Sequence, residues 1–530
     1  MNSKPLGDSR VDITSNAVYN WIGWIWPLLL GLLATPFIVS HLGVAAYGIF
    51  ALLSVVTGYL SVMDLGLSEA AVKFIAEYHV KGDIPTLQSI CRCSMFLFSI
   101  FGAIGALIVV ITTPLLVPNV FHVSAELVKP AKTAFYLMAI SFLINMWVGV
   151  LANVPEALQR YDLLNRVRLI LGTLSTLATV AVLALHYSLQ AVVLVQLAST
   201  LAGLVIQYSI ARHLLPYVTW WPRFDKKVFQ RLFNFGGSIL VNRITSLFNF
   251  QIPQGVIAAI SGTAQVTYYA IPLRLAVPLM SMFTTTLRAF FPMSAAMIGA
   301  ERQAGLKNIY LKATRLLVLM ATAIVLPMIF LSHPIMRYWM GVEFASHSYF
   351  ILAYLAGAFW LMAFTILPNS ILMGAGMPKY IAWMSLIGVF INVTLYFILT
   401  PKFGAAGLAA GFLIGTALIA PVSSHLAHSR VLKVGDLCVI TQAYARPILA
   451  ALTTGGVAYL GIVPHITSLL TLLLGFLALE VLYLVLCWAV GAIRFQDLRS
   501  WAEWLCGIAT NAFNKFLHRR QNDENVKASK

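Results

Sequence analysis

The sequence predicts an all-α polytopic membrane protein with about fourteen transmembrane helices. Of its 530 residues, 60% are hydrophobic and only 10% are charged, and the mean hydropathy is +0.86. A soluble multidomain protein is far less apolar. Apolar windows of about twenty residues, the length that spans a bilayer, recur along the chain, and the basic residues fall mainly between them.

The predicted spans begin close to the N-terminus. The first fifteen residues are polar and the apolar run after them has no clear small-residue cleavage site, so we expect the first span to be retained. In chain order the spans are 16–38, 45–66, 90–113, 130–152, 166–185, 189–211, 233–258, 266–291, 309–331, 348–373, 380–399, 404–427, 444–463 and 467–492.

The Lys and Arg residues predict the orientation. With the N-terminus inside, 28 of the 35 lie in inner segments, 4 in outer loops and 3 within spans. Cytoplasmic loops carry the basic excess, so both termini are predicted to be cytoplasmic. The net charge of +17 is therefore a topology signal, and we expect no nucleic-acid partner.

The chain resembles itself at a separation of six helices. Three pairs of segments match: those from His41 and Ile260, from Ala157 and Leu372, and from Leu189 and Gly404. In the first pair Gly43 stands opposite Gly262 and, after a shift of two, Tyr47 opposite Tyr268. The offsets of about 215 to 221 residues predict two six-helix lobes in the same orientation around a central cleft. The alternative is that apolar sequences resemble one another by composition alone.

The repeat divides the chain into segments. The N-lobe and the C-lobe are joined by a basic linker, and a hairpin and a basic amphipathic tail follow them. The tail has aromatic residues at helical spacing, which is typical of a helix lying on anionic lipid. The predicted segments are a cytoplasmic tail 1–15, an N-lobe 16–213, a cytoplasmic linker 214–232, a C-lobe 233–428, a hairpin 444–492 and a cytoplasmic tail 493–530.

Three arginines lie inside predicted spans: Arg243, Arg274 and Arg288. An arginine in hydrocarbon is costly, so its default interpretation is a functional group that faces a cavity, here one suited to an anion. Arg243 is expected roughly 15 Å inside the membrane, and Arg274 roughly 12 Å from the outer boundary. Arg288 is expected near the inner boundary, where a side chain reaching to the interface is an equally good interpretation.

Acidic residues fall on the other lobe. Asp64 and Glu69 lie at the inner end of the second span and just beyond it, and by the repeat they are at a depth similar to Arg288. We hypothesise an ion pair between the lobes at an inner gate. The alternative is that Asp64 is solvated and Glu69 pairs with Lys73 at helical spacing. Glu480 lies outside the repeat and is not assigned to the site.

No enzymatic site can be assembled from the sequence. The five cysteines are odd in number and lack paired spacing, and Cys91 and Cys93 have no second ligand pair nearby. No Ser/His/Asp set, nucleotide loop or metal cluster is present. We therefore expect no catalytic residue, no metal and no cofactor.

Several short motifs resemble those of a known family. They are His41-Leu42-Gly43 followed by Ala46-Tyr47-Gly48, the run DLGLSEAAVK from Asp64 to Lys73, and Gln159-Arg160-Tyr161-Asp162 after the fourth span. Their order and spacing, over roughly residues 10 to 430, resemble the O-antigen (Wzx-type) polysaccharide flippases of the multidrug/oligosaccharidyl-lipid/polysaccharide (MOP) exporter superfamily. Members of that family have twelve or fourteen helices.

The resemblance implies a function and a location. The chain would be a carrier in the bacterial inner membrane that moves an undecaprenyl-diphosphate-linked oligosaccharide from the cytoplasmic to the periplasmic leaflet by alternating access. The process would serve surface polysaccharides such as the O-antigen of lipopolysaccharide. The partners it implies are the lipid-linked oligosaccharide, membrane lipids, and a polysaccharide polymerase with its chain-length machinery.

A diphosphate suits the planar guanidinium fork, so Arg243 and Arg274 are the predicted substrate-binding residues. Arg288, Asp64 and Glu69 are predicted to form the gate or to bind substrate. Two alternative functions are weighed against this one. A MATE-like drug or cation antiporter would favour acids at the site, of which Asp64 is the one candidate, and a membrane-embedded glycan polymerase or ligase would carry a large periplasmic loop.

Overall fold

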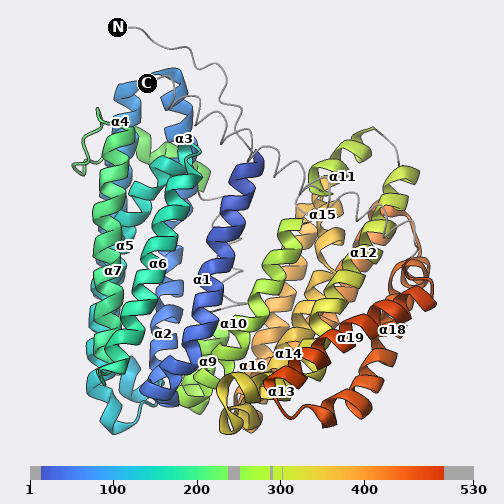
Figure 1. Ribbon diagram of the computed structural model, residues 1–530. Helices are drawn as coiled ribbons and strands as arrows, with labels where there is room; N and C mark the ends of the chain where they lie inside the picture. The colour runs from blue at the N-terminus through green and yellow to red at the C-terminus, as the bar shows by residue number, and fades with distance from the viewer. Residues whose placement is uncertain (1–12, 237–250, 287–289, 301–302, 494–530) are drawn as a thin grey trace, which may run out of the picture.

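The computed structural model describes residues 13–236, 251–286, 290–300 and 303–493. All regular elements in these ranges are helical. Two groups of long helices stand beside each other, and a hairpin covers the outer side of the second group (Figure 1). The predicted all-α membrane class is confirmed.

The first group is the N-lobe. Its longest helices cross the lobe from end to end, and α3 caps one end together with the start of α4. The helices are α1 (Ile13–Leu42), α2 (Val44–Leu60), α3 (Leu67–Lys81), α4 (Ile84–Leu115), α5 (Ala125–Ala157), α6 (Tyr161–Ala184) and α7 (Leu189–Leu214).

The second group is the C-lobe, and the hairpin follows it. The C-lobe helices are α9 (Ile252–Ser261), α10 (Thr263–Thr286), α11 (Phe290–Gly299), α12 (Gln303–Phe330), α13 (Ser332–Met340), α14 (Val342–Ala363), α15 (Ile366–Gly374) and α16 (Pro378–Ala427). After a short α17 (Asp436–Val439), the hairpin consists of α18 (Ala445–Val457) and α19 (Leu469–Ala489). Both hairpin helices pack against α12.

Twelve helical segments in the described ranges are long and apolar enough to cross a membrane. One of them, 378–432, contains 55 residues, which would extend about 80 Å as a straight helix and exceeds the roughly 30 Å hydrocarbon core. Gly404 (φ 56°, ψ −137°) breaks it, as the two predicted spans require. The predicted span 233–258 lies largely outside the described residues, so the number fourteen stays a prediction.

The backbone confirms the internal repeat. Gly43 (φ 80°, ψ 157°) precedes α2, and Gly262 (φ 81°, ψ 176°) ends α9 and precedes α10. Each glycine amide donates to the carbonyl four residues before it, Val39 or Ala258, at 2.9 and 3.2 Å. Only glycine adopts this φ without strain. The two joints have the same backbone geometry 219 residues apart, as the predicted repeat requires.

A second joint repeats as well. At the end of α5 the amides of residues 158, 159 and 160 donate to the carbonyls of residues 154, 156 and 155. At the end of α15 the amides of residues 375, 376 and 377 donate to those of residues 371, 373 and 372, an identical pattern 217 residues later. Gln159 (φ 56°) and Gly376 (φ 72°) both take a left-handed conformation there. This common helix end also occurs at residues 185–187 and 490–492, so it is consistent with the predicted pairing of the segments from Ala157 and Leu372 without establishing it.

The second predicted span, 45–66, agrees with a membrane-crossing segment that runs from Val44 to Asp64. Within it, α2 ends at Leu60 and a tight 3-10 turn, Ser61–Asp64, follows. Leu65 and Gly66 take left-handed conformations (φ 52° and 74°), and the separate helix α3 then occupies the predicted connection. Asp64 supports this bend, because its Oδ1 accepts a hydrogen bond from the Ser68 amide at 2.9 Å.

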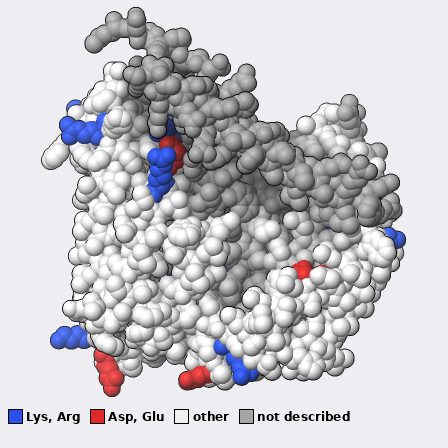
Figure 2. All heavy atoms as spheres, in the orientation of Figure 1, with Lys and Arg blue, Asp and Glu red and all other residues white. Residues whose placement is uncertain are grey.

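Charged residues gather at the two ends of the molecule. Figure 2 shows Lys, Arg, Asp and Glu near the ends of the visible face, with a central zone that is nearly free of charged atoms. We call these ends the Gly43 end, where α2 and α10 begin, and the Lys81 end, where α3 gives way to α4. At the latter, Asp83 caps α4 by accepting from the Thr86 amide at 3.1 Å, and hydrogen bonding to Thr86 lowers the pKa of the Asp83 carboxyl.

The two lobes meet at the Gly43 end. Helix α2 packs along α10, and the Thr267 hydroxyl donates to the Val44 carbonyl at 2.6 Å. The Trp339 indole donates to the Leu32 carbonyl at 2.9 Å. A Cβ atom on Gly48 would overlap the carbonyl oxygen of Thr263, so the two backbones are in direct contact. The lobes are therefore closed against each other at this end.

Candidate functional site between the two lobes

A cavity of about 530 Å³ lies between the lobes. Helices α1 and α2 form its N-lobe wall, and α9 and α10 form its C-lobe wall. Most of its lining is apolar. The polar side chains among the described lining residues are Tyr47, Ser54, Gln254 and Arg274.

Arg274 is the charged side chain in this lining. It lies on α10 eleven residues after Thr263, roughly 16 Å from the Gly43 end. Its side chain is exposed to the cavity. The prediction that Arg274 faces a cavity is therefore in agreement with the structure.

Two residues of the opposite lobe orient the guanidinium group. Its Nη1 donates to the Thr35 hydroxyl oxygen at 3.3 Å, and that hydroxyl in turn donates to the Gly31 carbonyl at 2.6 Å. The guanidinium carbon lies 5.8 Å from the centre of the Tyr47 ring, within the range of a cation–π contact. Thr35 and Tyr47 are both buried, so they form a fixed support for Arg274.

This arrangement suits an anionic ligand. A guanidinium group carries five N–H donors in a planar fork, and the bond to Thr35 occupies one of them at a long distance. A cation in a mostly apolar cavity attracts a phosphate or carboxylate more strongly than it would in water. The Gln254 amide and the Ser54 hydroxyl supply neutral hydrogen-bonding groups on the same lining.

The other two predicted arginines cannot be compared with the structure. Arg243 falls within 237–250 and Arg288 within 287–289, both outside the described residues. Their place at the cavity or at a gate stays a prediction.

The predicted acids lie near the Lys81 end, away from Arg274. Asp64 is buried in the bend after α2, and Glu69 is exposed in the first turn of α3. Glu69 and Arg168 are both electrostatic neighbours of Glu156 at the end of α5. Lys73 lies over the rings of Phe74 and Phe235, at 4.6 and 4.3 Å from their centres. The structure thus places the two acids at one end of the molecule, in agreement with the sequence.

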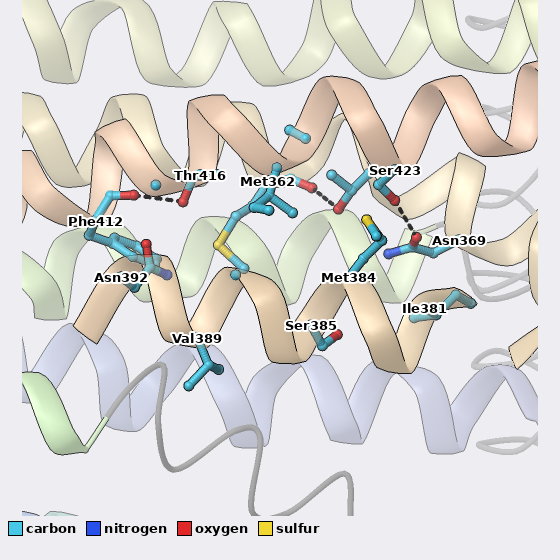
Figure 3. A pocket seen from close by; sticks show the side chains of 15 residues that line it. Met362, Asn369, Ile381, Met384, Ser385, Val389, Asn392, Phe412, Thr416 and Ser423 are labelled. Carbon is cyan, nitrogen blue, oxygen red and sulfur yellow. Dashed lines mark hydrogen bonds between the residues drawn. The ribbon is translucent and has the colours of Figure 1, made fainter. Parts of the chain in front are cut away.

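A second, smaller pocket of about 170 Å³ lies inside the C-lobe, between α14, α15 and α16 (Figure 3). Its polar lining is neutral, with the Ser423 hydroxyl donating to Asn369 Oδ1 at 2.9 Å. Asn392 is 6% exposed, and its Oδ1 has no hydrogen-bond partner within the described part of the chain. This pocket was not predicted, although Asn369, Asn392 and Ser423 are polar residues inside predicted spans and could have indicated it.

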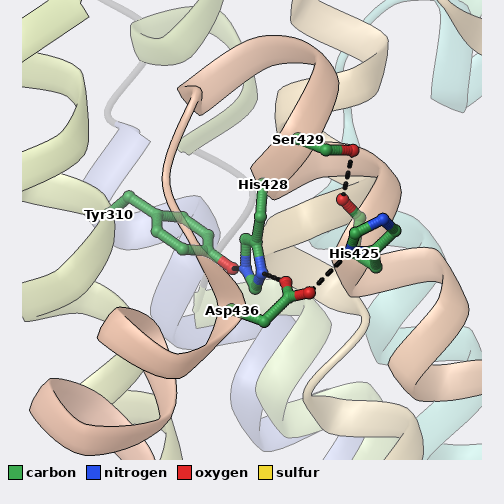
Figure 4. A network of polar contacts seen from close by, with 5 residues as sticks. All are labelled: Tyr310, His425, His428, Ser429 and Asp436. Carbon is green, nitrogen blue, oxygen red and sulfur yellow. Dashed lines mark hydrogen bonds and ion pairs between the residues drawn. The ribbon is translucent and has the colours of Figure 1, made fainter.

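A polar network joins the C-lobe to the hairpin (Figure 4). Asp436 accepts from His428 Nδ1 at 2.7 Å and from His425 Nδ1 at 2.5 Å. Because His428 Nδ1 carries a proton, the neutral ring accepts at Nε2, where the Tyr310 hydroxyl lies at 2.7 Å. The network connects α12, the residues at the end of α16 and the start of α17. His425, His428 and Asp436 lie within twelve residues of one another, but Tyr310 is 118 residues from His428, so only the fold shows this contact.

Comparison with known proteins gives consistent matches. A family model described as "Polysaccharide biosynthesis protein" matches residues 41–349, more than half of the chain. A protein of Shigella flexneri described as "Putative O-antigen transporter" is 24% identical over 414 residues, which cover 76% of this chain and 95% of that protein.

Two solved structures share the fold. The inward-facing conformation of a multidrug resistance MATE family transporter of the MOP superfamily has a TM-score of 0.66 at 15% identity, covering 79% of this chain and 99% of that one. The lipid II flippase MurJ, in an inward closed conformation, has a TM-score of 0.66 at 14% identity, covering 89% and 97%. With the family model matched over more than half of its length, the chain belongs to the polysaccharide biosynthesis protein family.

Proposed function

We propose that this protein flips an undecaprenyl-diphosphate-linked oligosaccharide from the cytoplasmic to the periplasmic leaflet by alternating access, for the synthesis of surface polysaccharide such as O-antigen. The observation that carries the proposal is Arg274, a supported cation on the wall of a cavity between two repeated lobes. The similarity to an O-antigen transporter and the fold shared with a lipid II flippase support it.

The proposal includes an orientation in the bacterial inner membrane. The Lys81 end and both termini face the cytoplasm, as the 28 inner and 4 outer basic residues predict. The segments predicted above, from the tail 1–15 to the tail 493–530, keep the cytoplasmic and membrane-spanning locations given there. The Gly43 end is periplasmic. The contacts between the lobes then close the periplasmic side, so the cavity receives substrate from the cytoplasmic side.

In this proposal the diphosphate binds at Arg274, and Arg243 contributes a second guanidinium group. Oxygens of the diphosphate compete with Thr35 for the Arg274 donors, since the Arg274 to Thr35 bond is long at 3.3 Å. That bond runs from α10 to α1, so its replacement by a ligand removes one tie between the lobes. No bond of the substrate is broken, and the protein acts as a carrier that delivers the glycan to a polymerase and its chain-length machinery.

The test compares the gene deletion with Arg274 variants. The deletion should accumulate undecaprenyl-diphosphate glycan on the cytoplasmic face and abolish surface polysaccharide. Arg274→Ala should fail to restore it, and Arg274→Lys should restore it in part, because a point charge replaces the bidentate fork. Arg337→Ala is the matched control, since Arg337 also lies over a ring, that of Tyr338 at 5.7 Å, but does not line the cavity. Normal polysaccharide in the deletion would refute the proposal.

We further propose that Asp64 and Glu69 face Arg288 across an inner gate when the cytoplasmic side is closed. Charge reversal by Asp64→Arg should stop transport, and Arg288→Asp in the same chain should restore part of it. The transport activity of the double variant is compared with the product of the two single-variant activities, each relative to the unaltered protein. If it is no higher, the two positions are not coupled and the proposed gate is refuted.

A further inference from the structure

The segment that joins the lobes, residues 215–236, is fixed to the N-lobe. The Gln88 amide donates to the Thr219 hydroxyl at 2.7 Å, and Arg92 Nε donates to the Trp221 carbonyl at 3.1 Å. The Arg223 amide returns a hydrogen bond to the Arg92 carbonyl at 3.2 Å. Four apolar side chains of the segment are buried in the N-lobe core: Leu215, Val218, Val228 and Leu232. The backbone of this joining segment is therefore held against α3 and α4.

The outer side of the joining segment combines aromatic and basic side chains. The Trp221 side chain is 77% exposed, Phe224 48% and Phe233 44%. The basic residues Arg223, Lys226, Lys227 and Arg231 are exposed beside them. The acid of the segment, Asp225, accepts from the backbone amides of Lys227 and Val228 at 2.9 and 3.2 Å. Exposing large aromatic rings to water costs free energy, whereas rings and cations together are stabilised in a lipid headgroup layer.

The position of the joining segment along α4 fits that layer. Exposed apolar side chains on α4 mark its lipid-facing band: Ile100, Ile104, Leu107, Ile108, Val110, Ile111 and Leu115. The Phe224 ring lies 5.6 Å from the ring of Phe96, which is roughly 6 Å along the helix from Ile100, and Trp221 is bonded to Arg92, roughly 12 Å from Ile100. The headgroup layer occupies roughly the first 5–8 Å beyond the hydrocarbon. Phe224 is therefore at headgroup depth, and Trp221 lies just beyond the headgroup layer on the aqueous side.

We infer that the outer side of the joining segment binds anionic phospholipid of the leaflet at the Lys81 end. The phosphate groups contact Arg223, Lys226 and Lys227, and the ring of Phe224 inserts among the headgroups while Trp221 lies at their water-facing side. This surface holds the N-lobe, and with it the start of the C-lobe, at a set depth in the bilayer. The inference depends on the membrane fold and not on the identity of the transported molecule.

The first test measures lipid selectivity of the full-length protein. It is placed in nanodiscs of phosphatidylcholine with a minor fraction of phosphatidylglycerol, and the lipids that stay bound on gentle extraction are counted by native mass spectrometry. Replacing three surface cations should weaken retention of phosphatidylglycerol about a hundredfold. The variant is Arg223→Ala/Lys226→Ala/Lys227→Ala. The control, Lys129→Ala/Lys132→Ala/Lys402→Ala, removes three charges from the other end and should keep the selectivity. Equal losses in both variants would overturn the inference.

The second test needs no charge removal and so does not depend on how the triple variant folds. A benzophenone amino acid at position 224 should cross-link to phospholipid under ultraviolet light, and to phosphatidylglycerol more than to phosphatidylcholine. The same group at position 383, where Trp383 is 64% exposed on a membrane-crossing segment, should cross-link to both lipids in proportion to their amounts. Absence of lipid cross-links at position 224, or identical lipid ratios at both positions, would overturn the inference.

Discussion

At the scale of the residue, backbone contacts between the lobes depend on glycine. A Cβ on Gly48 would overlap the Thr263 carbonyl, and a Cβ on Gly66 would overlap the carbonyl of Gly236. Gly48 lies within α2 and Gly66 in the bend before α3, and at both positions two main chains touch. Arg274 depends on the same closeness, since its supports Thr35 and Tyr47 belong to the other lobe.

We expect Gly48→Ala to separate the lobes at the Gly43 end. The added methyl group meets backbone atoms, which cannot rotate away, so α2 must move from α10 at a cost of about 1–3 kcal/mol. Transport should fall, and spin labels on α2 and α10 should report a longer distance between the lobes. Gly149→Ala is the control, because nothing lies within 4 Å of its added Cβ. An unchanged distance in Gly48→Ala would mean that the closed contact is not set by this position.

At the scale of the element, one carboxylate ties the start of α17, which leads into the hairpin, to the end of the C-lobe. Asp436 at the start of α17 satisfies His428, which is buried, and His425, which is more exposed. Tyr310 of α12 completes the hydrogen bonding of the buried ring. Helices α18 and α19 reach the C-lobe mainly along α12, so the network adds a polar attachment just before the hairpin.

We expect Asp436→Ala to destabilise the protein by about 1–3 kcal/mol, since the buried His428 Nδ1–H would lose its acceptor. His425→Ala breaks the exposed half of the same network and should cost about 0–1 kcal/mol. Thermal unfolding of the purified full-length protein measures both. Equal effects of the two substitutions would show that the buried half of the network is not what stabilises the attachment.

At the scale of the whole molecule, the closed Gly43 end and the interlobe cavity define one state of a two-lobe carrier. The repeated joints at Gly43 and Gly262 place α2 and α10 in equivalent positions, and these two helices form much of the contact between the lobes. Any opening of the cavity toward the Gly43 end must part them.

Joining α2 to α10 should therefore stop transport. In a cysteine-free background, Val44→Cys/Thr267→Cys treated with a short bis-thiosulfonate reagent bridges the positions where Thr267 now bonds to Val44. Flipping, followed as surface polysaccharide, should cease and return on reduction. Asn369→Cys/Ser423→Cys joins two positions within the C-lobe that also share a hydrogen bond and should leave rigid-body motion intact. Full activity of the bridged Val44/Thr267 pair would exclude opening at this end.

The sequence by itself determined the features that follow from local chemistry. Apolar length set the spans, the basic residues predicted the orientation, and the repeat gave the joints at Gly43 and Gly262, because each depends on residues close together in the chain. The cost of burying a guanidinium group also singled out Arg274.

Only the tertiary structure decided which groups meet. It brought Thr35 and Tyr47 beneath Arg274, placed Asn392 in an unpredicted pocket, and joined Tyr310 to His428 and Asp436. It also showed that the second span closes with a tight 3-10 turn, Ser61–Asp64, before the left-handed residues Leu65 and Gly66. These contacts link residues far apart in sequence, and neither hydropathy nor spacing specifies which faces of packed helices touch.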